Sequence, residues 1–161
     1  MNKTLLGIAV CAAMPFANAA GETNESVAAQ QITRAGTQAA ATGPADYFTG
    51  RARVDRLFPA SSEINASGAY VTFEPGARSA WHSHPAGQRL VVVSGVGLTQ
   101  EWGKPVQEIR AGDVVVCPPG VKHWHGAAPT SAMTHLAVTG AVEGKNVEWQ
   151  EKVTDDQYNA R

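Results

Sequence analysis

Histidines are the residues in this 161-residue chain whose type and spacing point most directly to chemistry, and there are five of them. Four form two His-x-His pairs, His82 with His84 and His123 with His125, and the fifth is His135. Along a β-strand, residues i and i+2 lie on the same face, so each pair would direct two imidazoles the same way. Because imidazole suits Zn, Fe, Cu and Ni, this favours a transition-metal site over surface histidines on an edge strand.

The fifth histidine lies in the segment AMTHLAV, where alternation places Met133, His135 and Ala137 on one face of a strand. A single histidine on such a strand is more often a core residue than a ligand. Two pairs and a fifth histidine, with none elsewhere in the chain, favour a shared site instead. The same alternation predicts that Trp81 and Trp124 face away from that site and pack outside the barrel.

Short β-type segments separated by glycine and proline must position these histidines. They are ARVDRLF, AYVTF, RLVVV, LTQEW, VQEI, VVVC, KHWHGA, AMTHLAV and NVEWQEKV. Many short strands at regular spacing predict a single all-β barrel or sandwich domain. The absence of an amphipathic stretch long enough for a crossover helix argues against a parallel α/β sheet. The tail VTDDQYNAR could form one helical turn.

Residues 1–19 have the pattern of a cleaved secretory signal peptide. Lys3 supplies a positive charge, an apolar run extends from Leu5 to Met14, and Ala17-Asn18-Ala19 is a small-x-small cleavage site. No later stretch reaches the length of a membrane span. We therefore expect an exported, soluble protein, and a bacterial periplasm is the expected location.

Residues 20–45 are predicted to form a flexible leader, and residues 46–161 the folded domain. Within the leader, residues 30–36 could form a short strand that docks on the domain or on a second subunit. Cleavage would leave Cys117 as the one cysteine, which excludes an intramolecular disulfide and is interpreted as a small buried hydrophobe. A net charge near zero without basic runs argues against nucleic acid or a membrane as partner, and favours a small molecule.

Two spaced motifs resemble those of the cupin superfamily. Residues 76–95 read G-x5-H-x-H-x3-Q-x6-G, and residues 112–123 read G-x5-P-x-G-x2-H. The resemblance implies a double-stranded β-helix, or jelly roll, with a metal held inside the barrel. It implies that the metal ligands are His82, His84, Gln88 and His123.

The chain departs from the usual cupin pattern at two positions. Gln88 replaces the glutamate of the first motif, and Ala127 replaces the asparagine that often closes the second. With an amide in place of a carboxylate, a divalent ion keeps its full double charge, which makes it a stronger Lewis acid and a better site for an anion. The alternative is a decayed site that no longer holds metal.

A closer resemblance covers the chain from about Gly43 to Tyr158. The segments GPADYFTG, VTFEPGARSAWHSHPAGQ, KHWHGAAPTSAMTHLAV and VTDDQY resemble the small manganese-dependent cupins with hydroxynitrile lyase activity. This implies reversible cleavage of a cyanohydrin to an aldehyde and HCN, with Mn as the expected metal and Fe, Co, Ni or Zn as alternatives. His135 is then the leading acid/base candidate, and His125 is a second pocket residue.

Other functions remain open from the sequence. The chain could be a different cupin enzyme, a dioxygenase or an isomerase, or a non-catalytic module that binds a metal or a small ligand. Four apolar positions could form an aryl-binding wall or ordinary core: Val92, Met133, Ala137 and Trp149. The resemblance further implies a homodimer or a homotetramer, because a small jelly roll leaves sheet edges that need cover.

Overall fold

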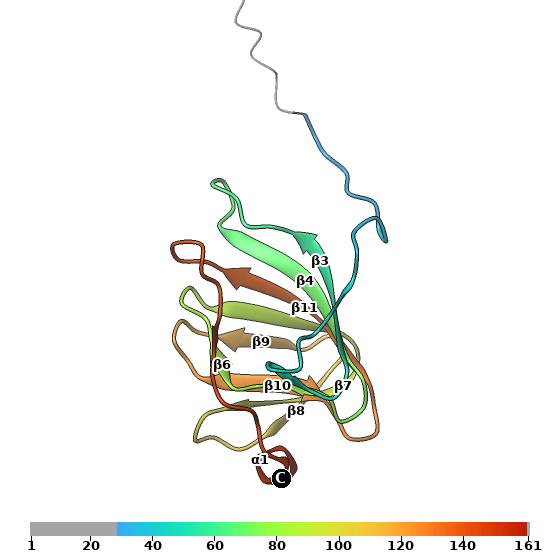
Figure 1. Cartoon of the computed structure of the whole chain (residues 1–161), viewed down its shortest axis with the longest axis vertical. Coiled ribbons are helices and arrows are strands. Elements are labelled where there is room, and N and C mark those ends of the chain that lie inside the picture. Colours follow the sequence, from blue (N-terminus) through green and yellow to red (C-terminus); the bar gives the residue numbers. More distant parts are fainter. Residues whose placement is uncertain (1–28, 161) are drawn as a thin grey trace, which may run out of the picture. The chain divides into compact units, whose positions relative to one another are not determined.

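The computed structural model describes residues 29–160, so the predicted signal peptide (1–19) and the first part of the leader lie outside the described residues. The chain divides into two units, Met1–Ile32 and Thr33–Arg161. The second unit contains the predicted site and is described below (Figure 1).

Strands dominate this unit, as the sequence predicts, and their sheet curls around an interior (Figure 1). One short helix follows them near the C-terminus. The elements are β1 (Ala41–Thr42), β2 (Phe48–Thr49), β3 (Ala52–Phe58), β4 (Ala66–Phe73), β5 (Arg78–Ser79), β6 (His82–Ser83), β7 (Gln88–Glu101), β8 (Gln107–Arg110), β9 (Val114–Cys117), β10 (His123–Ala127), β11 (Met133–Gly140), β12 (Glu148–Trp149) and α1 (Asp155–Asn159).

The long strand β7 joins two sheets. Its first part pairs with β11 and β9, and its second part pairs with β10 and β8. On one side the order continues from β11 to β4, β3 and β1; on the other it continues from β10 to β5 and β2, while β6 pairs with both β10 and β12. All of these pairings are antiparallel. The site histidines come from both sheets, because His82 and His123 lie on β6 and β10 whereas His135 lies on β11.

Continuity of β7 corrects the prediction of two separate strands, RLVVV and LTQEW, divided by a turn at 94–97. The chain instead passes from one sheet to the other within a single strand. Gly95 has φ +78°, and a Cβ atom there would lie 1.9 Å from the carbonyl oxygen of Ala132. Only glycine tolerates both the left-handed conformation and this close approach.

Two other segments differ from the expectation. Residues 30–36 contain no strand in this chain, and the first strand, β1, comes later in the predicted leader and pairs with β3. NVEWQEKV forms a strand only at Glu148–Trp149. Whether the leader docks on a second subunit stays a prediction.

An apolar cluster fills the interior beside the histidines and includes Phe73, Val92 and Met133. A second cluster lies outside β10, where Trp81 and Trp124 pack against the C-terminal segment together with Leu98, Val153 and Tyr158. The outward packing of both tryptophans confirms the prediction from strand alternation.

The tail forms helix α1, as the sequence predicts. Thr154 caps it, because its hydroxyl accepts a bond from the Gln157 backbone N–H while the Gln157 side chain accepts one from the Thr154 N–H. No helix within residues 29–160 is long and apolar enough to cross a membrane.

Candidate metal centre

Three buried histidines have one ring nitrogen fixed by a backbone carbonyl. Nδ1 of His82 lies 2.9 Å from the carbonyl oxygen of Ala80, and Nδ1 of His123 lies 2.9 Å from that of Val121. Nδ1 of His84 lies 2.6 Å from the carbonyl oxygen of residue 146. A carbonyl can only accept, so each Nδ1 carries the proton and donates it. Each neutral ring therefore keeps its lone pair on Nε2, which is the arrangement used by metal-ligating histidines.

The strands bring these three rings together. His82 lies on β6 directly opposite His123 on β10, and their ring centroids are 4.4 Å apart. His84 follows the end of β6, with its ring 5.0 Å from that of His82 and 5.4 Å from that of His123. Thus the structure places three of the four predicted ligands side by side.

Gln88, the fourth predicted ligand, is buried at the start of β7. Its Nε2 donates a 3.0 Å hydrogen bond to Oγ1 of Thr139, which lies opposite it on β11. Its Oε1 is buried without a hydrogen-bond partner. The amide is therefore held by its nitrogen, and its oxygen remains available as a ligand.

Unpaired polar atoms are concentrated at this site. Within the described residues, the buried side-chain nitrogen and oxygen atoms without a hydrogen-bond partner are Nε2 of His84, Oε1 of Gln88, Nε2 of His123, Nε2 of His125 and Nδ1 of His135. Each buried unsatisfied group costs roughly 1–3 kcal/mol, so five together approach the whole stability of a typical domain. Five buried polar atoms without partners in one place indicate a site built for a ligand.

His125, which the sequence predicts only as a second pocket residue, lies beside two of the predicted ligands. Ring nitrogens of His82, His123 and His125 all lie within 4.8 Å of one another. This buried triad could bind a metal ion. It includes two of the predicted ligands and leaves out His84.

His125 differs from the other two members of the triad in its anchor. Its Nδ1 lies 3.1 Å from Nε2 of His135, which belongs to β11. No backbone carbonyl of the described residues bonds to the His125 ring. The ring of Phe73 lies beside both imidazoles, with ring centroids 5.8 Å apart in each case; it is perpendicular to the His125 ring and tilted relative to the His135 ring. His125 therefore belongs to a two-imidazole pair that adjoins the carbonyl-anchored histidines.

All five histidines are neutral at pH 7. Burial lowers the pKa of His123 and that of His135 to about 4. Burial also lowers the pKa of His82 and of His125 well below the usual value, and neighbouring histidines lower both further. The pKa of His84 is lowered by burial, which the carbonyl of residue 146 and Gln88 partly oppose. Neutral rings are what metal binding requires, because a proton and a metal compete for the same lone pair.

Aromatic rings cover His82 from one side. The ring of Trp149, on β12, lies 4.9 Å from that of His82, and Tyr47 stacks on Trp149 at 4.7 Å. Of the four positions predicted as an aryl wall, Val92 and Met133 are buried in the core cluster and Trp149 packs against it. Ala137 lines a cavity, described next.

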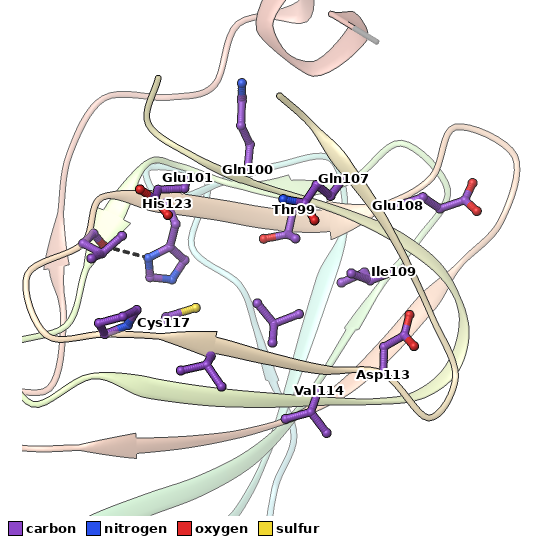
Figure 2. Close-up of a pocket in the computed structure, with 14 residues that line it drawn as sticks. Thr99, Gln100, Glu101, Gln107, Glu108, Ile109, Asp113, Val114, Cys117 and His123 are labelled. Carbon is purple, nitrogen blue, oxygen red and sulfur yellow. Dashed lines mark hydrogen bonds between the residues drawn. The ribbon is translucent and has the colours of Figure 1, made fainter. Parts of the chain in front are cut away.

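Two cavities adjoin the site. The larger, of about 900 Å³, is lined by the concave faces of β3, β4 and β11 and reaches Thr139 and Asn146, which bond to Gln88 and His84. The smaller, of about 420 Å³, is bounded by β7 to β10 and reaches His123 (Figure 2). Cys117 lines it, and burial raises the pKa of this thiol to about 11, so it is protonated at neutral pH as the sequence predicts for a buried hydrophobe.

Two residues that hold predicted ligands in place, Thr139 and Asn146, were not predicted from the sequence. Thr139 could have been found, because it lies four residues after His135 on the same face of the same strand. Asn146 acts through its backbone carbonyl, and no side-chain pattern indicates that.

Comparison with known proteins places this geometry in a family. The family model of the cupin domain matches residues 69–139. The (R)-mandelonitrile lyase of Granulicella tundricola is 58% identical over 128 residues, which cover 80% of this chain and 98% of that protein. This chain belongs to the cupin family.

Solved structures agree with the cupin fold. A cupin-like protein from Thermotoga maritima is 42% identical with a TM-score of 0.68, over 80% of this chain and 95% of that one. A cupin 2 conserved barrel domain protein from Rhodopseudomonas palustris has a TM-score of 0.59 at 20% identity, over 74% and 79% of the two chains. The predicted jelly-roll barrel is thus confirmed for this cupin.

Proposed function

We propose that this cupin is a metal-dependent hydroxynitrile lyase that reversibly cleaves a cyanohydrin to an aldehyde and HCN. The single observation that carries the proposal is the group of buried polar atoms without hydrogen-bond partners on His84, Gln88, His123, His125 and His135. The 58% identical relative is named for its action on (R)-mandelonitrile, which supports the same reaction class here.

The ligands we propose are Nε2 of His82, His84 and His123 together with Oε1 of Gln88. In each of the three histidines, Nδ1 donates to a backbone carbonyl and Nε2 is the unprotonated nitrogen. In Gln88, the amide nitrogen donates to Thr139. A divalent ion bound there supplies Lewis-acid polarisation of the substrate oxygen. Manganese is the proposed ion, on the resemblance to manganese-dependent cupins.

The His125–His135 pair is the proposed proton carrier. In a bond between two neutral imidazoles, one nitrogen donates and the other accepts. If Nδ1 of His125 donates, then Nε2 of His125 has a lone pair and Nδ1 of His135 carries a proton; if Nε2 of His135 donates, these roles are exchanged. In either state one end of the pair accepts a proton and the other end donates one.

This property fits the proton balance of cyanohydrin cleavage. The hydroxyl proton leaves, the bond between the carbinol carbon and the nitrile carbon breaks, and cyanide departs with the electron pair and takes up a proton. Nε2 of His125 is the end nearer the proposed ligands, so it faces the hydroxyl, and the pair returns a proton to cyanide. A general acid/base typically contributes ~10²- to 10⁴-fold to the rate.

Substrate reaches the site through the larger cavity in this proposal. That cavity ends at Thr139 and Asn146, beside Gln88 and His84, and small side chains such as Ala69 and Ala137 leave room for an aryl group. Export to the periplasm, and assembly as a homodimer or a homotetramer, are also part of the proposal. They rest on the N-terminal pattern of the sequence and on the resemblance to other cupins.

Metal content and mandelonitrile cleavage, measured on the same purified chain, test the function. We expect about one manganese ion per chain, benzaldehyde release that stops after chelation, and recovery when Mn²⁺ is added back. A protein that holds metal but releases no more benzaldehyde than free Mn²⁺ would contradict the lyase proposal and leave the cupin fold intact. Light scattering tests the assembly, because a monomeric mass contradicts it.

A further inference from the structure

Arg56 is the only charged side chain among the described residues that line the larger cavity. It lies on β3 directly opposite Ala69 of β4, just as Val54 lies opposite Val71. Val54 and Val71 both belong to the interior, so alternation places Arg56 on the same concave face two residues further along. Arg56 therefore stands at the exposed end of the concave face, where its guanidinium is open to solvent and to a ligand.

No ion pair or hydrogen bond of the Arg56 side chain occurs within residues 29–160. The neighbouring arginine on this strand, Arg53, faces the other way and is paired with Asp55 at 2.7 Å. Glu63, near the same rim, is exposed and accepts a bond from the Ser62 hydroxyl, and it does not line the cavity. Arg56 is also exposed, so its unpaired guanidinium can contact an anion in the cavity.

Space in front of Arg56 is left open by small residues. Its row across the sheet continues through Ala69 on β4 and Ala137 on β11, while the next row contains Val71 and His135. With strands ~4.8 Å apart and two residues spanning ~6.7 Å, the Cα atoms of Arg56 and His135 are roughly 12 Å apart. The larger cavity, of about 900 Å³, is lined by this row of small residues and has room for a substrate with one benzene ring.

We propose that the cavity takes aromatic cyanohydrins or aldehydes that carry a carboxylate on the ring position remote from the reacting carbon, with Arg56 as the partner of that carboxylate. This inference rests on the proposed lyase function and narrows its substrate class. Arg presents a planar fork that matches a carboxylate, and among the described residues no carboxylate lines the larger cavity beside it. The carboxylate of Asp55, which borders a smaller hollow together with Arg56, is paired with Arg53. A divalent ion held by four neutral ligands would make the interior more positive still, which favours an anionic substrate.

The test compares kcat/KM for mandelonitrile and for its 4-carboxy derivative in the manganese-loaded protein. We expect a preference for the carboxylated substrate that weakens at high salt. Arg56→Gln should lower the ratio of the two kcat/KM values about five-fold, the size expected of an ion pair that stays in contact with water. Arg53→Gln is the matched control, because it removes the same charge from the opposite face of the same strand, and it should leave the ratio unchanged.

Equal ratios in the wild-type protein and Arg56→Gln would overturn the inference while leaving the lyase function standing. If neither substrate is cleaved, the lyase function fails, and calorimetric Kd values for benzaldehyde and 4-carboxybenzaldehyde decide the inference separately. Tighter binding of the carboxylated aldehyde that depends on Arg56 and not on Arg53 supports the anion site; equal binding of the two aldehydes overturns it.

Discussion

Nε2 of His135 and Nδ1 of His125 lie 3.1 Å apart in the interior of the barrel, and the outer nitrogen of each ring has no partner. Two imidazoles bonded in this way share one proton between them and present one accepting end and one donating end. In the proposed reaction they would therefore act as a single unit in proton transfer.

This unit predicts non-additive effects of mutation. His125→Ala and His135→Ala should each lower kcat for mandelonitrile cleavage by ~10²- to 10⁴-fold, and the double variant should lose little more than either one, because residues that act together lose their function together. Steady-state kinetics with metal analysis on each variant measures this. His135→Ala should retain its manganese, and a double variant whose losses multiply would contradict the shared-proton arrangement.

The bond from Gln88 to Thr139 predicts a change in metal affinity. Thr139→Val keeps the shape of the side chain and removes the oxygen that accepts from the amide nitrogen, so the Gln88 oxygen is no longer held in place. Loss of such an outer partner typically weakens metal binding 10- to 100-fold, about the range expected here. A chelator competition in the absence of substrate gives the Kd, and Thr139→Ser should restore it. If Thr139→Val binds the metal as tightly as the wild-type protein, the Thr139 hydroxyl does not help to position Gln88 for the metal.

Buried neutral histidines predict that the metal-free protein becomes less stable as pH falls. The folded-state pKa of His123 and of His135 is about 4, whereas in the unfolded chain it is ~6.5. Between these values the unfolded state binds more protons, so the free energy of unfolding falls as pH falls, by up to about 1.4 kcal/mol per pH unit for each such histidine. Above pH 6.5 the effect is absent. Denaturant titrations at pH 7, 6, 5 and 4 measure the free energy of unfolding. If it does not change with pH, the histidines take up protons as readily in the folded state as in the unfolded state.

Arg78 holds the C-terminal segment against the barrel through hydrogen bonds and a contact with an aromatic ring. Its buried guanidinium donates to the carbonyl oxygen of Val153 at 3.1 Å and to Asp155 at 2.6 Å, and it stacks 4.7 Å from the ring centroid of Tyr158. Arg78→Met should lower the free energy of unfolding by about 2 kcal/mol, as expected for a charged hydrogen bond.

Hydrogen exchange locates the effect of Arg78→Met, because residues 153–159 should lose protection before the strands do. Arg53→Met is the control, since it removes an exposed pair that contributes little. If exchange of the C-terminal segment is the same in Arg78→Met and in the wild-type protein, the segment is held by its apolar contacts alone.

Local patterns in the chain were sufficient to predict the all-β class, the segment bounds of β3 and β9, the helical tail and the outward packing of Trp81 and Trp124. These depend on neighbours within a few residues: period-two alternation, turn residues and the capping signal at Thr154. The two spaced motifs, through their resemblance to cupins, also indicated which histidines would meet. The bend in β7 was missed, because its cause is the carbonyl of Ala132, a residue 37 positions from Gly95 that no local pattern brings near.

What the sequence by itself determined is the set of side chains able to bind a metal or move a proton, since residue type decides which atoms carry lone pairs. Only the tertiary structure decided which of those lone pairs stay free. The backbone carbonyl of Asn146 selects the tautomer of His84, and Thr139 orients Gln88. The pairing of β10 and of β11 with β7 brings His125 beside His135. The contacts of His84 and Gln88 join residues more than 50 positions apart, and even the His125–His135 contact joins two different strands, so hydrogen-bond direction depends on where the partner lies in space.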